Sequence, residues 1–195
     1  MSAAERAFAD SGGIRLTVLG ADIVQIAHLR SGAQELAGIA TARGWPLPRC
    51  GGVTPAARGV ALSVRPGRWL LLSAPGSPGE AAAGWQAACA RSGVAVDLSS
   101  ALAVVHVAGP AVREVLARGC RLDLAPEVFR PGAAAATIMA QVGVILAALP
   151  EGVLLLTPST TARHFREWLS LSALPFGLVP QADATVALLS GDPVK

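Results

Sequence analysis

The sequence predicts an α+β protein in which two similar β-α-β-β-α-β units pack into one compact body. Three observations predict this class. Apolar runs of strand length alternate with amphipathic helical stretches, the same order of elements occurs twice, and 195 residues suit one body of this kind. A chain of this size buries roughly 70% of the surface that its unfolded form exposes, so it needs no disulfide or metal for stability.

Two pairs of matching segments indicate the repeat. Residues 28–47 match residues 106–122, because each runs from a histidine near a strand end, through a turn of small residues, into a helix that ends at Arg-Gly. Residues 66–85 match residues 150–168, because each has a proline turn, a strand with three leucines and then a helix with a tryptophan at the same place. A duplication is the simplest explanation.

The first unit is predicted over residues 21–100. Its strands are expected at residues 23–29, 60–64, 69–73 and 94–98, where β-branched and aliphatic residues gather. Pro66-Gly67 predicts a turn between the middle two strands, because proline fixes φ at the second turn position and glycine accepts a positive φ at the third. Ser31 with Gln34 has the spacing of a capping box, which predicts the start of a helix.

The second unit is predicted over residues 101–182. Its elements are expected to be a strand at 102–108, a helix opened by Pro110, strands within 137–149 and at 153–157, a helix capped by Ser159 or Thr160, and a strand at 176–179. A bend is expected at Gly143. Residues 1–20 are interpreted as an N-terminal segment, and residues 183–195 as a C-terminal tail with one more short strand at 184–189.

The composition predicts contact with other proteins. Hydrophobic residues make up 52% of the chain and charged residues 15%, with a mean hydropathy of +0.51, whereas about a quarter of the residues in an ordinary soluble domain are charged. Such a chain exposes apolar surface, which predicts a large partner interface or a membrane. The net charge of +3 comes from scattered arginines without a basic stripe, so nucleic-acid binding is not predicted.

Residues 133–149 are almost wholly apolar, and a membrane span is the alternative to buried strands there. The stretch is shorter than the ~20 residues of a spanning helix, carries Gln141 at its centre and ends in a Pro-Glu-Gly turn sequence. Buried strands therefore explain it better. The N-terminal sequence lacks the apolar core of a signal peptide, and the three cysteines share no CxxC spacing, so we expect the protein in a reducing cytoplasm.

The segment ARGCRLDLAPEVFRPG, residues 117–132, raises the question of an active site. A nucleophilic Cys120 needs a lowered pKa, yet it follows Gly119 at a predicted helix end, where the helix dipole disfavours a thiolate. The preferred interpretation is a structural joint, in which Gly119 ends the helix and Asp123 bonds the turned backbone. Its stiffening prolines are Pro126 and Pro131, and its inward side chains are Leu122, Leu124 and Phe129.

Other reactive residue types lack the pattern of a site. Asp97, Ser99, Ser100 and His106 are of the types found in a hydrolase triad, but no Gly-x-Ser-x-Gly turn exposes a serine. Asp97 and Ser99 are instead expected to bond backbone groups where the chain passes from one unit to the next. His28 and His106 occupy equivalent repeat positions and could act as a pair, although a packed, locally bonded histidine is commoner at a strand end.

No metal or cofactor is predicted on this chain. No cluster of histidine, cysteine and carboxylate has metal-ligand spacing, and the Gly-Gly pairs fit neither a dinucleotide fingerprint nor a P-loop. The four tryptophans could form an aromatic cage. Since Trp85 and Trp168 occupy equivalent repeat positions, they are instead expected to anchor helices in the core.

A long motif supports a more specific interpretation. It comprises Asp97-Leu98-Ser99, Gly109-Pro110, Val115-Leu116, Gly119-Cys120, Leu122-Asp123-Leu124, Pro126, Phe129, Pro131-Gly132 and Thr137. With the hairpin at residues 66–71, it resembles the gamma subunit of heterotetrameric sarcosine oxidase over roughly residues 20–170. The sequence departs from that family at residues 133–136 and in its N-terminal region.

The resemblance implies the fold of the folate-binding domain of aminomethyltransferases, itself built from duplicated ferredoxin-like units. It implies a non-catalytic subunit with an assembly role in an oxidase that demethylates sarcosine. The partners would be the alpha, beta and delta subunits, and the large subunits of the complex would carry FAD, FMN, NAD and tetrahydrofolate. This chain would carry no cofactor and no catalytic residue, so the motif residues are interpreted as structural.

Three alternatives stay open. The parent complex could act on another N-methyl amino acid, as an oxidase or as a dehydrogenase. The chain could be a stand-alone folate-dependent enzyme or folate-binding regulator, for which Asp97 and Asp123 are the candidates to hold the pterin. It could also be a membrane-anchored scaffold.

Overall fold

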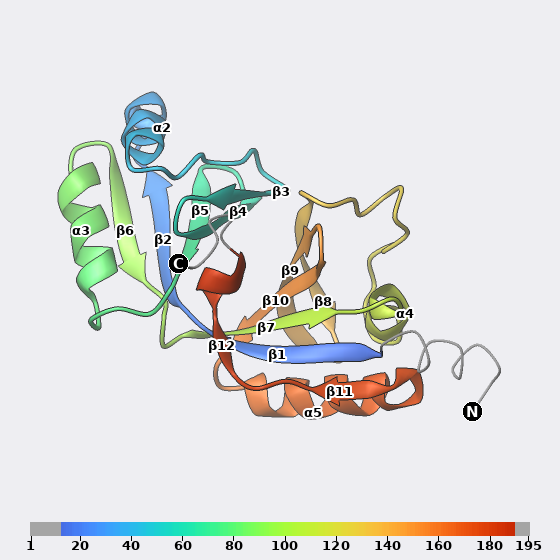
Figure 1. Ribbon diagram of the computed structural model, residues 1–195. Helices are drawn as coiled ribbons and strands as arrows, with labels where there is room; N and C mark the ends of the chain where they lie inside the picture. The colour runs from blue at the N-terminus through green and yellow to red at the C-terminus, as the bar shows by residue number, and fades with distance from the viewer. Residues whose placement is uncertain (1–12, 190–195) are drawn as a thin grey trace. The chain divides into compact units, whose positions relative to one another are not determined.

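The structure is a computed structural model that describes residues 13–189, and this part of the chain divides into two compact units (Figure 1). The first unit comprises residues 20–102 with residues 185–189. The second unit comprises residues 13–19 with residues 103–184. Each unit contains one β-sheet and two α-helices, so the predicted α+β class is confirmed.

The first unit has a five-stranded sheet in the order β3-β4-β5-β2-β6, and all neighbouring strands are antiparallel. Its elements are β2 (Asp22–His28), α2 (Ala33–Ala42), β3 (Gly52–Ala56), β4 (Gly59–Arg65), β5 (Arg68–Ser73), α3 (Glu80–Cys89), β6 (Gly93–Asp97) and the 3-10 helix η2 (Val186–Leu189). Strands β2, β4, β5 and β6 with the two helices form the predicted ferredoxin-like β-α-β-β-α-β order. Strand β3 is one strand more than predicted.

The second unit has a longer sheet in the order β11-β1-β7-β10-β9-β8, with β12 also paired to β1. Its elements are β1 (Ile14–Gly20), β7 (Leu102–Ala108), α4 (Val112–Ala117), β8 (Ala134–Met139), β9 (Val142–Leu149), β10 (Gly152–Pro158), α5 (Ala162–Ala173), the 3-10 helix η1 (Leu174–Phe176), β11 (Leu178–Pro180) and β12 (Ala184–Thr185). Helix α5 packs against α4 and β10 of this unit.

The two sheets follow the same strand order apart from one inserted strand. The run β8-β9-β10-β7 corresponds to β3-β4-β5-β2, which is the duplication predicted from the sequence. The next place is held by β6 in the first unit but by β1 in the second. Strand β1 is antiparallel to β7, with Leu16 opposite Val107, and β11 lies beyond it, parallel, with Ile14 opposite Leu178. A strand from the chain's N-terminal part therefore completes the second sheet.

Helices cover one face of each sheet with an apolar core. In the first unit Leu36 of α2 and Trp85 of α3 pack with Ile26 of β2, and in the second unit Leu116 of α4 and Phe165 of α5 share a second cluster. These five side chains are buried. Full burial of one large apolar side chain contributes about 1.5–3 kcal/mol. The helical layer of each unit therefore stabilises that unit.

In the first unit one predicted turn is confirmed, and one predicted helix cap is wrong. The predicted turn at Pro66-Gly67 is confirmed, with Gly67 at φ +70° between β4 and β5. The predicted cap at Ser31 is wrong, because Gly32 precedes α2 and no side chain caps this helix. A Cβ at Gly32 would lie 2.0 Å from the carbonyl oxygen of Ser92, so this close backbone approach places the glycine at the helix start.

Two predictions at the C-terminal side also need correction. Helix α5 follows Thr161, and neither Ser159 nor Thr160 caps it with a side chain. Only Ala184–Thr185 of the strand predicted at residues 184–189 is extended, and η2 follows it. The strand predicted at residues 176–179 is present as β11, but it pairs with β1. The remainder of the predicted tail, residues 190–195, lies outside the described residues, as do residues 1–12.

The apolar stretch at residues 133–149 forms a β-hairpin, which confirms the prediction of buried strands. Strands β8 and β9 pair from Ala134 opposite Ala147 to Met139 opposite Val142. The bend predicted at Gly143 is wrong, because the chain turns at the two residues before β9 and Gly143 lies within that strand. In residues 13–189 no helix is long and apolar enough to cross a membrane.

The turn of this hairpin contains two non-glycine residues in the left-handed region, Ala140 at φ +48° and Gln141 at φ +65°. Replacing Gln141 by glycine is expected to raise the free energy of unfolding by about 1 kcal/mol, because it relieves the steric conflict of a Cβ at positive φ. Urea denaturation measures the change. The same substitution at the exposed Gln34 of α2 is the control, and it should lower the free energy of unfolding by about 1 kcal/mol. A loss of stability at both positions would contradict the prediction.

Candidate functional site

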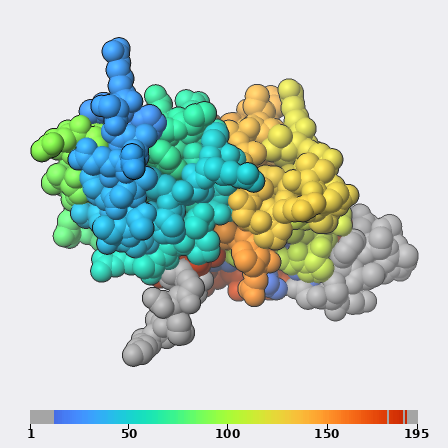
Figure 2. All heavy atoms as spheres, turned by 90° about the horizontal axis from the view of Figure 1, so that it is seen from above, coloured from blue at the N-terminus to red at the C-terminus, as the bar shows by residue number. Residues whose placement is uncertain are grey.

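The segment 117–132 connects α4 to β8 and packs on the core of the second unit. Leu124 and Phe129 are 5% and 6% exposed within that core, and Cys120 and Leu122 lie partly buried against it. The outer residues of the segment, among them both of its prolines, are exposed. Figure 2 shows this part of the chain as a continuous yellow surface. Its inner side chains therefore fill the core while its backbone runs over the surface.

Arg113 of α4 binds this segment through two backbone carbonyls. Its guanidinium donates from Nη1 to the oxygen of Leu124 and from Nη2 to the oxygen of Phe129, the latter at 2.9 Å. Hydrogen bonds from a charged donor are stronger than neutral ones. No motif or spacing in the sequence marks Arg113 as a contact residue. Its partners lie 11 and 16 residues further along the chain, and no local pattern signals such contacts.

Asp123 and Gly119 have the structural roles that the joint interpretation predicts. The Asp123 carboxylate accepts the N–H of Ala125 at 2.9 Å, which closes the turn after α4. Gly119 follows α4, and a Cβ at this position would lie 2.5 Å from the ring of Trp168 on α5. The glycine therefore allows the end of one helix to approach the other closely.

The remaining motif glycines lie at positions with positive φ, which favour glycine. Gly109 has φ +132°, and a Cβ there would lie 2.3 Å from the carbonyl oxygen of Gly13. Gly132 has φ +92°, and its N–H donates to the oxygen of Ala148 at 2.8 Å, which ties the end of the segment to β9. Pro126 and Pro131 lie in the exposed part of the segment.

Cys120 has no features of an activated nucleophile. Burial raises the pKa of its thiol, and hydrogen bonds from the backbone of Leu122 and Arg121 only partly oppose this effect. The residue forms an isolated β-bridge to Met139. Because a nucleophilic cysteine needs a lowered pKa, this environment favours the structural interpretation of Cys120.

Asp97 and Ser99 bond each other and the backbone instead of forming part of a triad. The Asp97 carboxylate accepts from the N–H of Ser99 at 2.9 Å and from its hydroxyl at 2.6 Å, and both bonds lower the pKa of Asp97. The Ser99 hydroxyl oxygen in turn accepts the N–H of Ile23 at 3.0 Å. A nucleophilic serine would donate its proton to a histidine, so this arrangement is that of a closed turn.

The two equivalent histidines pack against equivalent hairpin turns. A Cβ at Gly67 would lie 2.5 Å from Nε2 of His28, and a Cβ at Gly152 would lie 3.0 Å from Nε2 of His106. His28 donates from Nδ1 to the oxygen of Leu29 at 3.0 Å. His28 is thus packed and locally bonded, as predicted, whereas the bonding partner of His106 is the carbonyl oxygen of Glu151, 45 residues further along the chain. Within the described part of the chain, no three His, Cys, Asp or Glu side chains could hold a metal ion.

His106 makes stability depend on pH. Burial lowers its pKa below the ordinary value of 6.5, although Nε2 donates to the oxygen of Glu151 at 2.8 Å. The folded state therefore binds fewer protons than the unfolded state below about pH 6.5, so the contribution is present above that pH and is lost as pH falls. We expect the free energy of unfolding to decrease more steeply between about pH 7.5 and 5 in the wild type than in His106→Gln. Identical slopes in urea denaturation series would contradict this.

The two helical tryptophans anchor equivalent helix pairs. The guanidinium of Arg43, at the end of α2, lies 4.9 Å from the ring centre of Trp85 on α3. In the second unit Gly119, at the end of α4, lies against Trp168 on α5, which stacks on Phe165 with ring centroids 5.8 Å apart. Both Arg-Gly helix ends thus contact the tryptophan of the other helix. The sequence repeat therefore corresponds to a repeated helix contact.

Part of this chain is similar to a curated protein. No family model matches the chain. A segment of 119 residues is 36% identical to sarcosine oxidase subunit gamma of an Arthrobacter species. The match covers 59% of this chain and 57% of that relative, so it spans little more than half of the relative's length.

Solved structures extend the similarity to most of the chain. A chain of the heterotetrameric sarcosine oxidase from Corynebacterium sp. U-96, in complex with pyrrole 2-carboxylate, matches with a TM-score of 0.74 and 25% identity over 91% of this chain and 93% of that chain. The glycine cleavage system aminomethyltransferase T from Bartonella henselae matches with a TM-score of 0.66 and 13% identity over 94% of this chain and 51% of that chain, which shows a shared fold. This chain is therefore similar in sequence to sarcosine oxidase subunit gamma, and it has an aminomethyltransferase-like fold.

Proposed function

We propose that this chain is a non-catalytic subunit of a heterotetrameric sarcosine oxidase and that its role is assembly of the complex. The observation that carries the proposal is that the motif residues make structural contacts. Asp97, Gly119 and Asp123 close turns or allow close packing, and Leu124 and Phe129 fill a core. The similar chain from Corynebacterium sp. U-96 belongs to a heterotetramer, which supports the same setting for this chain.

The proposed partners are the alpha, beta and delta subunits of that oxidase. They would carry FAD, FMN, NAD and tetrahydrofolate and would oxidise sarcosine, while this chain carries no cofactor. Exposed apolar side chains support a protein partner, since Leu171 is 67% exposed and Leu174 is 57% exposed. We propose the cytoplasm as the site of assembly.

A folate-binding role has less support from the candidate carboxylates. The Asp97 carboxylate already accepts two hydrogen bonds from Ser99, and the Asp123 carboxylate accepts one from Ala125. A pterin would have to compete with these local bonds. We therefore place the tetrahydrofolate site of the proposed complex on another subunit.

Co-expression tests the proposed function. The chain should co-purify as a stoichiometric component when it is produced with the three other subunits from the same source, and the complex should be yellow and oxidise sarcosine. Alone, the chain should be colourless and inactive with sarcosine. Failure to bind the larger subunits, or turnover by the pure chain, would contradict the proposal.

A titration with tetrahydrofolate separates the folate-binding alternative. Tryptophan fluorescence of the isolated chain should stay flat as the folate is added, after correction for absorption by the ligand. Saturable quenching would favour a folate-binding protein instead.

A further inference from the structure

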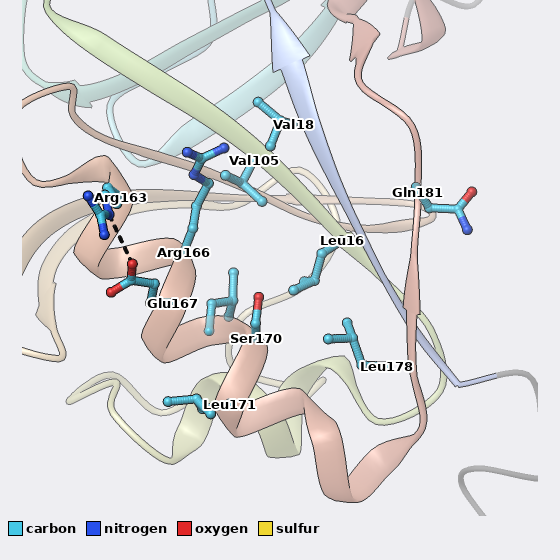
Figure 3. A pocket seen from close by; sticks show the side chains of 11 residues that line it. Leu16, Val18, Val105, Arg163, Arg166, Glu167, Ser170, Leu171, Leu178 and Gln181 are labelled. Carbon is cyan, nitrogen blue, oxygen red and sulfur yellow. Dashed lines mark hydrogen bonds and ion pairs between the residues drawn. The ribbon is translucent and has the colours of Figure 1, made fainter.

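The second unit has an apolar groove beside α5 (Figure 3). Its volume is about 680 Å³. The strands contribute Leu16, Val18, Val105 and Leu178 to its lining, and α5 contributes Arg163, Arg166, Glu167, Ser170 and Leu171. In Figure 3 Arg166 extends from α5, and Leu16 and Leu178 extend from β1 and β11, toward the space between the helix and these strands.

The inserted strand β1 explains why this groove is open. Neighbouring strands lie about 4.8 Å apart, so the six strands from β11 to β8 span about 24 Å. Packed helices lie about 8–10 Å apart, so α4 and α5 together cover about 20 Å of sheet. In the first unit the two helices face a five-stranded sheet. In the second unit the additional width leaves the helical face of β1 and β11 without a third helix.

The occupant of the groove must satisfy its own backbone. Strand β1 is paired on one edge with β7 and on the other with β11 and β12, so it has no free edge for an added strand. An extended segment on this apolar surface would leave its N–H and C=O groups without partners, which is costly, whereas a helix bonds these groups internally. The α5 side of the groove, from Arg163 to Leu171, is about 12 Å long. That length suits a helix of two to three turns.

The charges on the rim favour an acidic occupant. Arg163 and Glu167 form an ion pair at 3.0 Å and largely cancel each other. Arg166 is exposed and forms no ion pair with any residue between 13 and 189, so it leaves one positive charge at the edge of the apolar surface. A carboxylate on the occupant would complement this charge.

We propose that this groove binds an amphipathic helix of a larger subunit of the oxidase complex. The apolar side of that helix packs on Leu16, Val18 and Leu178, Leu171 closes one margin, and a carboxylate of the helix pairs with Arg166. The inference rests on the proposed function, because it takes the partner from the same complex.

Site-specific photo-crosslinking in the assembled complex identifies the occupant. A benzophenone amino acid is introduced at position 171, where the native leucine is 67% exposed and folding does not depend on its burial. After irradiation, mass spectrometry should find a peptide of a larger subunit with apolar residues at helical spacing and at least one carboxylate. The same probe at position 128, where the native valine is 59% exposed outside the groove, is the matched control and should not capture that peptide.

Two variants test the energetics in the same co-purification experiment. Leu171→Asp should weaken binding of the larger subunits about tenfold or more, because it places a carboxylate against an apolar helix face, and Arg166→Glu should weaken it by a similar factor through charge repulsion. Val128→Asp and Arg121→Glu make the same changes at exposed positions outside the groove and should leave binding within about twofold. Circular dichroism checks that all four variants keep the wild-type fold.

The outcomes separate the two proposals. If the wild-type chain does not bind the larger subunits, the proposed function is wrong, and this inference fails with it. If the wild type binds but the groove variants and their controls behave alike, the function stands and the groove assignment is overturned. A crosslink from position 171 to a second copy of this chain, or to this chain's own residues, would also overturn it.

Discussion

Replacing Gly119 by alanine is expected to lower the free energy of unfolding by about 2–3 kcal/mol, because the added methyl group overlaps a packed aromatic ring. The new Cβ would lie 2.5 Å from the Trp168 ring. That ring stacks on Phe165, a buried residue of the core, so it has little room to move away. Urea denaturation followed by circular dichroism measures the loss.

Two further variants identify the cause of this loss. Gly143→Ala is the matched control, because a Cβ at Gly143 has no neighbour within 4 Å, and its effect should stay within about 0.5 kcal/mol. The double variant Gly119→Ala/Trp168→Phe should lose less than the sum of its single variants, since the smaller ring leaves space for the methyl group. Additive losses would show that the clash with Trp168 is not the reason for the glycine.

Arg113→Met is expected to cost about 2–4 kcal/mol, because it removes two charge-assisted hydrogen bonds and leaves two carbonyl groups near the core without a partner. These are the carbonyls of Leu124 and Phe129, whose side chains are buried. Methionine keeps much of the unbranched apolar stem, so the loss reports mainly on the guanidinium. Relative to the wild type, the variant should show a larger increase in amide hydrogen exchange across residues 120–131 than elsewhere in the second unit.

The controls for Arg113 vary one property at a time. Arg113→Lys keeps the charge but replaces the two-pronged donor by a compact ammonium group, so its loss should be intermediate. Arg121→Met removes an exposed arginine of the same segment and should change stability by less than about 0.5 kcal/mol. If Arg113→Met were as mild as Arg121→Met, the segment would not depend on this contact.

Local patterns in the sequence predicted much of the fold. The turn at Pro66-Gly67, the strand at residues 102–108 and the buried strands within residues 133–149 agree with the structure. Each depends on residues close together in the chain, namely a preference for positive φ or a run of strand-forming side chains. The repeat was also visible, because each copy keeps the same order of such signals.

The sequence predicted a structural joint at residues 117–132, but it did not predict the contacts that this joint makes. The sequence indicated a joint at residues 117–132, and its inward leucine and phenylalanine side chains could be recognised from the apolar pattern. The clamp by Arg113 could not, because an arginine on a short helix is ordinarily solvent-exposed and nothing nearby marks its partners. The glycine at position 119 was recognised as a helix end, whereas its contact with Trp168 depends on how α4 and α5 approach each other.

The chain's order of strands and helices, its duplication and its similarity to a subunit family could be read from the residues in line, because short-range preferences and periodicity encode them. The insertion of β1 beside β7 could not be read in this way. Residues 1–20 were interpreted only as an N-terminal segment, and the apolar side chains of Ile14, Leu16 and Val18 do not indicate which sheet edge a strand would join. Its place beside β7 depends on packing between segments far apart in the sequence, and that place leaves the groove beside α5 open.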